Sequence, residues 1–186
     1  MRLFTGIDLP PKVASAIGAA QDTLKPHAAL KWSPVRNLHI TTKFIGAWPE
    51  ERLGELRAAL GTIPPRPAIP IKLDGLGWFP NPHQPRILWV RVDAPPSLAG
   101  LARETEERLE DLGVGREDRP YRPHLTLARI EDRKVDLAPL RQAIAGLPSA
   151  DLGEFEAGAF HLYLSQPEPG GSRYTKLAEF PFGAPA

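Results

Sequence analysis

The sequence predicts an α+β fold made of two similar lobes, and the first observation behind this prediction is a repeated pair of polar residues. His39 and Thr41 lie in a segment that alternates polar and apolar residues, and so do His124 and Thr126. Alternation with a period of two is typical of a β-strand. Within each segment, the histidine and the threonine are therefore expected to project from the same face of a sheet.

The spacing between the two pairs is the second observation. Advancing by 85 positions carries the first His-x-Thr pair onto the second without a gap, and also carries Asp8-Leu9-Pro10-Pro11 onto Asp93-Ala94-Pro95-Pro96. The chain is therefore interpreted as an internal repeat, with units at about 1–85 and 86–186. Two units packed around a local two-fold axis would bring both pairs to the walls of one central cleft. In the plainer alternative, the pairs line separate strand faces and never meet.

Apolar periodicity, glycines and prolines divide the first unit into strands and helices. Pro10 and Pro11 favour the start of a helix, and Gly61 is typical of a residue that ends one. In order, we expect a strand over 2–8, a helix after Pro11, the first His-x-Thr strand ending at Gly46, a helix over 49–61, a strand containing Ile69, Ile71 and Leu73, and a loop over 75–84.

The second unit repeats this alternation of strands and helices. We expect a strand over 86–93, a helix over 95–112, a charged loop over 113–120, the second His-x-Thr strand, a helix over 136–146, a strand over 155–165, a turn at Gly170-Gly171 and a strand over 174–180. The order β-α-β-α-β in each unit predicts two lobes, each a small antiparallel sheet with its helices on the outer face. At 186 residues, the whole chain suits one bilobal domain.

The composition excludes several classes of protein. A net charge of +1 is unlike that of a strongly basic nucleic-acid binder, although it leaves a local basic patch open. The chain has no cysteine, so thiolate metal sites and cysteine nucleophiles are absent, which fits a reducing compartment. No apolar run approaches the length of a membrane span, and the N-terminal apolar stretch is too short for a signal peptide. We expect a cytoplasmic protein with no membrane partner, and we take it to be a monomer.

Two imidazoles and two hydroxyls in one cleft suit the cleavage of a phosphodiester. An imidazole has an ordinary pKa of about 6.5, so one histidine can act as general base while the other, protonated, acts as general acid. The threonine hydroxyls can donate hydrogen bonds to the non-bridging phosphate oxygens. Neither copy has a carboxylate or a second histidine at the spacing of a zinc site, and the sequence contains no phosphate-binding glycine loop or serine-nucleophile motif. We therefore expect neither a metal ion nor a cofactor.

The two motifs resemble those of the 2H phosphoesterase superfamily. His39-Ile40-Thr41-Thr42 and His124-Leu125-Thr126-Leu127 match its paired His-x-Thr-x motifs. Within it, the chain is most similar to the bacterial and archaeal RNA 2′,3′-cyclic phosphodiesterases, often labelled 2′-5′ RNA ligases. Further similarity lies in Lys43-Phe44-Ile45-Gly46, in Ala128-Arg129 and in Gly170-Gly171-Ser172-Arg173-Tyr174. The resemblance therefore spans nearly the whole chain.

The resemblance implies that the chain hydrolyses a terminal 2′,3′-cyclic phosphate on RNA to a 2′-phosphate without a metal ion. It implies that His39 donates a proton to the leaving 3′ oxygen and that His124 accepts a proton from water. The duplication alone leaves these two roles open. Members of the family are also credited with joining tRNA halves through a 2′-5′ linkage, so RNA ends, including those of tRNA halves, are the expected partners.

Four further residues are candidates for contacts to the RNA. Lys43 shares the parity of the first His-x-Thr pair, so it either faces the phosphate or lies exposed at the strand end. Arg129 is an anion contact by resemblance, yet simple alternation from the second pair puts it on the opposite face. Either a bulge or the strand end reorients it, or it is structural. Phe44 and Tyr121 are candidate platforms on which bases stack.

Two other functions would use the same residues. The first is the hydrolysis of a small cyclic nucleotide in place of RNA. The second is a non-catalytic module that binds RNA ends or phosphate. The pair of histidines argues against the second, because Arg or Lys would serve binding alone better.

Overall fold

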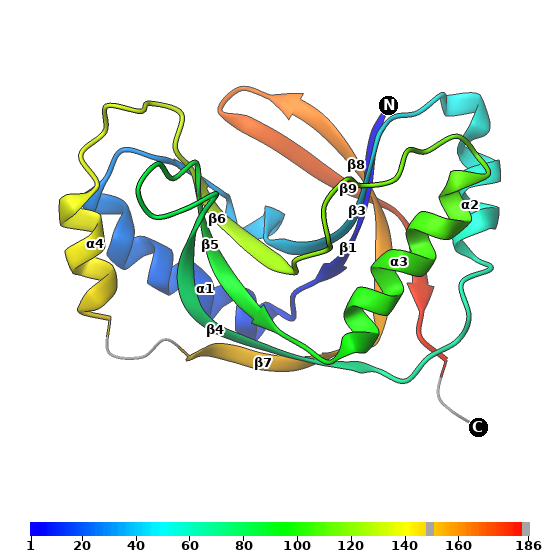
Figure 1. The fold of residues 1–186 in the computed structure, drawn as a ribbon, viewed down its shortest axis with the longest axis horizontal. Coiled ribbons are helices and arrows are strands. Elements are labelled where there is room, and N and C mark those ends of the chain that lie inside the picture. The colour runs from blue at the N-terminus through cyan, green and yellow to red at the C-terminus, as the bar shows by residue number, and fades with distance from the viewer. Residues whose placement is uncertain (148–150, 184–186) are drawn as a thin grey trace.

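The computed structural model describes residues 1–147 and 151–183, which form a curled antiparallel sheet flanked by helices (Figure 1). The strands are β1 (Arg2–Asp8), β2 (Lys31–Trp32), β3 (His39–Ala47), β4 (Ile69–Phe79), β5 (Ile87–Asp93), β6 (His124–Arg129), β7 (Asp151–Ala157), β8 (Ala159–Glu168) and β9 (Gly171–Pro181). The helices are α1 (Pro11–Leu24), α2 (Leu53–Leu60), α3 (Pro96–Glu110) and α4 (Ala138–Ala145), with short 3-10 turns η1 (Lys25–His27), η2 (Val35–Asn37) and η3 (Glu50–Arg52). The predicted α+β class is confirmed.

The sheet joins the two units at its centre. Within the described residues, its strands follow the order β7-β4-β5-β6-β3-β1-β8-β9, with β2 paired to β6 at the side. The central neighbours β3 and β6 carry the two His-x-Thr pairs, and their pairing rests on Ile40 opposite Leu125. The two small antiparallel sheets predicted from the sequence are thus present as half-sheets, joined edge to edge at this residue pair.

Each unit of the chain contributes strands to the half-sheet of the other. β4 comes from the first unit and pairs with β5 of the second, while β8 comes from the second unit and pairs with β1 of the first. The helices follow the same exchange. α1 contacts β7 and α4 outside one half-sheet, and α3 contacts β3 and α2 outside the other (Figure 1). The two units are therefore interlocked.

The predicted loop over 75–84 is wrong in its first part. β4 continues to Phe79 and pairs with β5 along this stretch. The ladder contains an extra residue between Leu73 and Leu76, and Gly75 within it has a φ of 81°. A β-bulge of this kind interrupts the alternation of side chains without ending the strand, so a glycine-rich strand was mistaken for a loop.

The single strand predicted over 155–165 is also wrong. The segment contains the end of β7 and the start of β8, which are separated by Gly158. β7 pairs with β4 in one half-sheet, and β8 pairs with β1 in the other. Both strands carry apolar residues, so periodicity alone does not reveal that the chain changes half-sheets there.

The outer face of the sheet packs against the helices and forms the core. Ile40, Leu125 and Leu127, which were predicted to face the core, are fully buried. Each helix buries one stripe against them, represented by Ile17 on α1 and Leu101 on α3. Burial of one such side chain contributes about 1.5–3 kcal/mol. This packing fixes which face of β3 and β6 is left for the His-x-Thr pairs.

Within residues 1–147 and 151–183, no helix has the length and apolar character needed to cross a membrane. The cytoplasmic location and the monomeric state stay predictions.

Candidate active site

The two His-x-Thr pairs meet where the half-sheets join. The residue pair that connects β3 to β6 points into the core, so the residues beside it project from the opposite face. On that face the antiparallel register sets His39 opposite Thr126 and Thr41 opposite His124. The two histidines are then diagonal neighbours, with β-carbons about 7 Å apart. The structure therefore brings the four residues to one face of the sheet, where β3 meets β6.

His39 is held from both sides of its ring. Its Nδ1 donates to the carbonyl oxygen of Asn37 at 2.7 Å, because a carbonyl can only accept. Its Nε2 lies 2.9 Å from the hydroxyl of Thr41, which can donate to it while the ring is neutral. The ring also packs 4.7 Å from Phe4 and edge-on to Tyr174 at 5.2 Å, measured between ring centres. The imidazole is thus oriented with Nε2 beside Thr41.

Burial of the imidazole lowers the pKa of His39 below the ordinary 6.5. The hydrogen bond to Asn37 and the carboxylate of Asp8 act in the opposite direction, and the positive charges of His124 and Arg129 lower the pKa further. His39 is therefore mainly neutral at pH 7 in the free protein. The same balance shows that these charged groups lie within electrostatic reach of its ring.

His124 has an equivalent arrangement on the neighbouring strand. Its Nδ1 donates to the carbonyl oxygen of Arg122 at 2.8 Å, two residues earlier in the chain, which repeats the geometry at the first histidine. Trp89 on β5 lies edge-on to the ring at 6.2 Å. Trp89 is 85 positions after Phe4, so each histidine packs against an aromatic residue at an equivalent place in the duplication. In both copies the backbone occupies Nδ1, and Nε2 is the atom available for chemistry.

Gly77 on β4 makes room for the indole of Trp89. A β-carbon at position 77 would lie 2.7 Å from two indole atoms, closer than real contacts allow. We expect Gly77→Ala to displace the ring from His124 and to lower the free energy of unfolding by about 1–3 kcal/mol. Urea unfolding measures this loss, and Gly100→Ala in α3, where a new methyl group meets nothing within 4 Å, is the control. Equal unfolding free energies for Gly77→Ala and the wild type would contradict the expected clash.

A β-bulge turns Arg129 toward the site. Adjacent residues of β5 pair with Thr126 and Ala128, so Leu127 is an extra residue on β6. Simple alternation from His124 would place Arg129 on the outer face. The bulge inverts the alternation and leaves Arg129 exposed on the face of the histidines.

The corresponding bulge in β3 turns Lys43 away from the site. Adjacent residues of β1 pair with Thr41 and Lys43, so Thr42 is the extra residue. Lys43 therefore projects from the outer face, where its ammonium donates to the carboxylate of Glu106 at 2.6 Å and to the carbonyl oxygen of Gly115 at 2.7 Å. The structure does not bring this predicted substrate contact to the histidines.

The bulge in β3 also brings Phe44 to the face of the histidines. Its cross-strand partner is Phe4, with ring centres 6.3 Å apart, and 59% of its surface is exposed. Phe44 and Arg129 are 85 positions apart, so the two bulges deliver one aromatic and one basic side chain to equivalent places. Tyr121 is instead packed against the core, and its hydroxyl donates to the carbonyl oxygen of Thr41 at 2.9 Å. Tyr121 therefore stabilises β3, and its ring is not available for a base to stack on.

Sequence reasoning missed the residues that oppose the histidines on the next strands outward. Asp8 on β1 is the direct partner of His39, and Arg91 on β5 is the direct partner of His124. Directly opposed side chains project from the same face, with β-carbons about 4.5–5.5 Å apart. Asp8 forms an ion pair with Lys176. The repeated Asp-x-Pro-Pro motif was a usable signal for Asp8, whereas no sequence pattern indicated Arg91.

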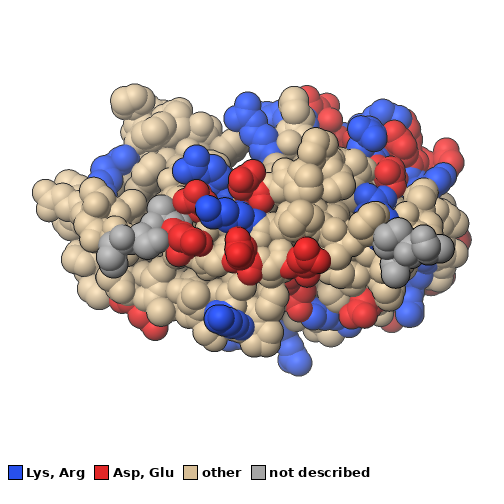
Figure 2. All heavy atoms as spheres, turned by 90° about the horizontal axis from the view of Figure 1, so that it is seen from below, with Lys and Arg blue, Asp and Glu red and all other residues tan. Residues whose placement is uncertain are grey.

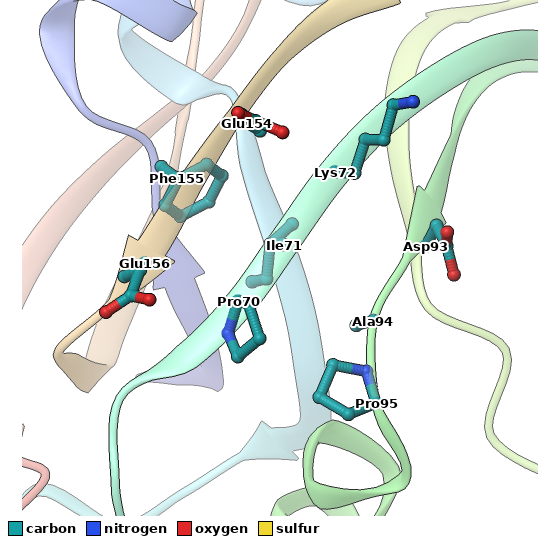
Figure 3. A pocket seen from close by; sticks show the side chains of 9 residues that line it. All are labelled: Pro70, Ile71, Lys72, Asp93, Ala94, Pro95, Glu154, Phe155 and Glu156. Atoms are coloured by element: carbon teal, nitrogen blue, oxygen red, sulfur yellow. The ribbon is translucent and has the colours of Figure 1, made fainter.

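A separate hollow lies at the edge of the half-sheet that contains β4, β5 and β7. Its space of about 630 Å³ is lined by Lys72, Asp93, Glu154 and Glu156, among others (Figure 3). Acidic side chains gather in the middle of the face seen from below (Figure 2). Three carboxylates beside one ammonium make this hollow unsuitable for phosphate. Across the part of the chain that the structure describes, no group of three His, Asp or Glu side chains could hold a metal ion.

Comparisons with known proteins agree with the duplication and with the whole-chain similarity. A family model described as "LigT like Phosphoesterase" matches residues 7–89 and again residues 90–174. The RNA 2′,3′-cyclic phosphodiesterase of Methanocaldococcus jannaschii is 36% identical over 182 residues, which cover 97% of this chain and 100% of that protein. The protein of the same name from Thermus thermophilus is 35% identical over 187 residues, with 97% and 89% covered. A crystal structure of Escherichia coli LigT complexed with 3′-AMP matches with a TM-score of 0.80 and 27% identity over 98% of each chain.

Proposed function

This chain belongs to the family of LigT-like phosphoesterases, and on that premise we propose that it hydrolyses a terminal 2′,3′-cyclic phosphate of RNA to a 2′-phosphate. The observation that carries the proposal is the repeated geometry of the two histidines. In each, the backbone occupies Nδ1 and leaves Nε2 available on one shared face of the sheet. Two such groups can move protons on opposite sides of a single phosphorus.

The reaction divides between the two imidazoles. Water attacks phosphorus while its proton passes to Nε2 of His124. The bond from phosphorus to the 3′ oxygen breaks as Nε2 of His39 gives its proton to that oxygen, and the 2′ ester bond stays intact. The hydroxyls of Thr41 and Thr126, with the guanidinium of Arg129, stabilise the negative charge that develops on the non-bridging oxygens. Because imidazoles move the protons, the mechanism requires no metal ion.

As proton donor, His39 depends on negative charge brought by the substrate, because among the protein's own charges His124 lowers its pKa by more than Asp8 raises it. Asp8 lies opposite it and raises its pKa against the effect of burial. A bound phosphate adds a second negative charge beside Nε2 and raises the pKa further. His39 therefore takes up its proton as the substrate binds.

The lowered pKa of His39 in the free protein predicts a particular pH profile. The profile of kcat/KM reports groups of the free enzyme, and that of kcat reports groups of the enzyme–substrate complex. Only protonated His39 can donate, so kcat/KM should fall as the pH rises through its lowered pKa, on the acid side of 6.5. With phosphate bound, kcat should persist to higher pH. Steady-state kinetics across this range provides the measurement, and coincident alkaline limbs would contradict the assignment.

Phe44 offers a platform for the terminal base. Its exposed ring lies on the same face as His39, next to Phe4. Stacking on an aromatic ring accepts every base, because each base has a π-face. This suits an enzyme that recognises the end of an RNA and not its sequence.

An oligonucleotide that ends in a 2′,3′-cyclic phosphate tests the proposal when it is offered in the presence of a chelator. We expect turnover to an oligonucleotide with a 2′-phosphate end. A preference for a cyclic mononucleotide would favour small cyclic nucleotides as substrates, and tight binding without product would favour a non-catalytic module. Loss of turnover with the chelator would contradict the metal-free mechanism.

Ligation by the same ring opening is a further part of the proposal. A ribose 5′-hydroxyl in place of water would join two RNA ends through a 2′-5′ linkage, and tRNA halves with these ends are the proposed partners. The test is to supply a 5′-hydroxyl RNA with the cyclic-phosphate RNA and to look for a joined product. Without such a product at high RNA concentration, the ligation part of the proposal is wrong.

A further inference from the structure

Arg91 is fixed against β4 by the inner end of its guanidinium group. Its Nε donates to the carbonyl oxygen of Asp74 at 2.9 Å. The guanidinium lies against Gly75, where a β-carbon would come within 2.5 Å of Nη2. Gly75 has a φ of 81°, which favours glycine, so the backbone leaves open the space that Arg91 fills. The cation is therefore oriented before any ligand binds.

Although it is fixed, Arg91 has no anionic partner among the described residues. Arg52, Arg66 and Arg116 each form an ion pair with a glutamate, whereas Arg91 is an exposed residue that forms none with the described residues. A guanidinium presents parallel N–H groups that match two oxygens of one phosphate. A rigid guanidinium also loses less freedom on binding than a mobile one. Arg91 thus has the properties of a phosphate ligand.

Arg91 lies one strand outward from His124. It is the direct partner of His124, so both side chains project from the same face, and neighbouring strands are about 4.8 Å apart. Its bond to Asp74 directs the guanidinium toward β4, away from His39. If the cyclic phosphate lies between the histidines, a phosphate one nucleotide further along the chain can reach Arg91.

On the opposite side of the site, an acidic residue takes the position that corresponds to Arg91. There the partner of His39 is Asp8, whose charge is balanced by the ammonium of Lys176. Beyond Arg91, the surface turns acidic, since Lys72 is flanked across the sheet by Asp93 and Glu154 at the hollow (Figure 3). Electrostatics therefore favours one phosphate at Arg91 and no further phosphates past it.

From these contacts we infer that Arg91 binds the phosphate on the 5′ side of the terminal nucleotide and so directs the RNA chain across β5. This inference rests on the proposed function, because it takes the cyclic phosphate to lie between the histidines. It identifies the preferred substrate as a nucleotide with a 2′,3′-cyclic phosphate and a phosphate group on its 5′ oxygen. Through this contact the enzyme binds RNA ends more tightly than nucleoside 2′,3′-cyclic phosphates, which carry no 5′-phosphate.

Three substrates measure this contact directly. They are adenosine 2′,3′-cyclic phosphate, the same nucleotide with a 5′-phosphate, and a trinucleotide with a cyclic-phosphate end. For the wild type, kcat/KM should rise by about tenfold on adding the 5′-phosphate, with most of the gain in KM, and should rise little more for the trinucleotide. A steady increase with each added nucleotide would contradict a single phosphate site.

The matched variants are Arg91→Gln, Gly75→Ala and Arg103→Gln. Arg91→Gln should bring the ratio of kcat/KM with and without 5′-phosphate close to one, and Gly75→Ala should reduce it by moving the guanidinium while keeping its charge. Arg103→Gln removes the same charge from the exposed surface of α3 and should keep the wild-type ratio. Any influence of Arg91 on His124 acts on both substrates and cancels in the ratio. A wild-type ratio in Arg91→Gln would overturn the inference.

A binding measurement separates failure of this inference from failure of the proposed function. If the wild type turns over none of the three substrates, the proposed function fails. Calorimetric affinities for adenosine 3′,5′-bisphosphate and for 3′-AMP still compare ligands with and without the 5′-phosphate. A preference for the bisphosphate that is lost in Arg91→Gln supports the subsite, and equal affinities in the wild type contradict it.

Discussion

Alanine in place of His124 is expected to reduce kcat for hydrolysis of a 2′,3′-cyclic-phosphate RNA end by about 10²–10⁴-fold, and His39→Ala should have an effect of the same order. Each substitution removes one of the two Nε2 atoms that exchange protons with the reacting oxygens. The imidazole of His124 is not needed to fill the core, because the apolar neighbours on β6 face the other way, whereas that of His39 also packs against Phe4 and Tyr174. Initial rates with a cyclic-phosphate oligonucleotide provide the measurement.

Asparagine at the same positions separates catalysis from orientation. In His124→Asn, the side-chain amide can still donate to the carbonyl oxygen of Arg122, as Nδ1 does, but nothing replaces Nε2. We expect this variant to be as inactive as His124→Ala and to unfold in urea as the wild type does. His83→Ala removes an exposed histidine from a loop and should keep full activity. If His39→Ala or His124→Ala retained the wild-type rate of hydrolysis, the two-histidine mechanism would be wrong.

The sequence was sufficient to predict the repeat and the meeting of the two motifs, because both depend on local patterns. An offset of 85 positions and a period of two are visible without knowing which strands pair. The orientation of the residues after each motif was harder to predict. Thr42 and Leu127 look like ordinary members of an alternating strand, yet each is the extra residue of a bulge. Parity therefore assigned Lys43 and Arg129 to the wrong faces.

The exchange of strands between units could not be predicted from periodicity. The boundary placed at about residue 85 falls within the connection between β4 and β5, which pair with each other. A short connection between antiparallel strands carries a small entropic cost, so the end of one unit pairs with the start of the next. This places Gly75 and Gly77 of the first unit beside Arg91 and Trp89 of the second. The arrangement around His124 thus depends on contacts between units that no local pattern encodes.

Lys43→Met is expected to lower the free energy of unfolding by about 3 kcal/mol, because it leaves Glu106 without its cation. The side chain of Lys43 is only 2% exposed, whereas that of Glu106 is 20% exposed and retains some hydration, which puts the loss at the low end for such pairs. Burial opposes ionisation of Glu106, but the hydrogen bonds from Lys43 and from the Glu117 amide, with the charges of Lys43 and Arg116, together outweigh it and hold the pKa of this carboxyl below its usual range. The pair therefore stabilises the fold above the pKa of the unfolded carboxyl, and its contribution fades as the pH falls through the lowered value. Urea unfolding at neutral and acid pH measures both effects.

The double variant Lys43→Met/Glu106→Leu decides between a structural and a catalytic role for Lys43. Replacing both members of a buried ion pair by apolar residues often costs little, so this variant should recover most of the stability that Lys43→Met loses. If Lys43 acts only through Glu106 and the Gly115 carbonyl, the double variant should also turn over RNA ends at nearly the wild-type rate. If Lys43 instead contacts the phosphate, the recovered fold would still show a large loss of activity. Stability and turnover in one protein thus show whether the bulge at Thr42 has moved this lysine from the active site to the core.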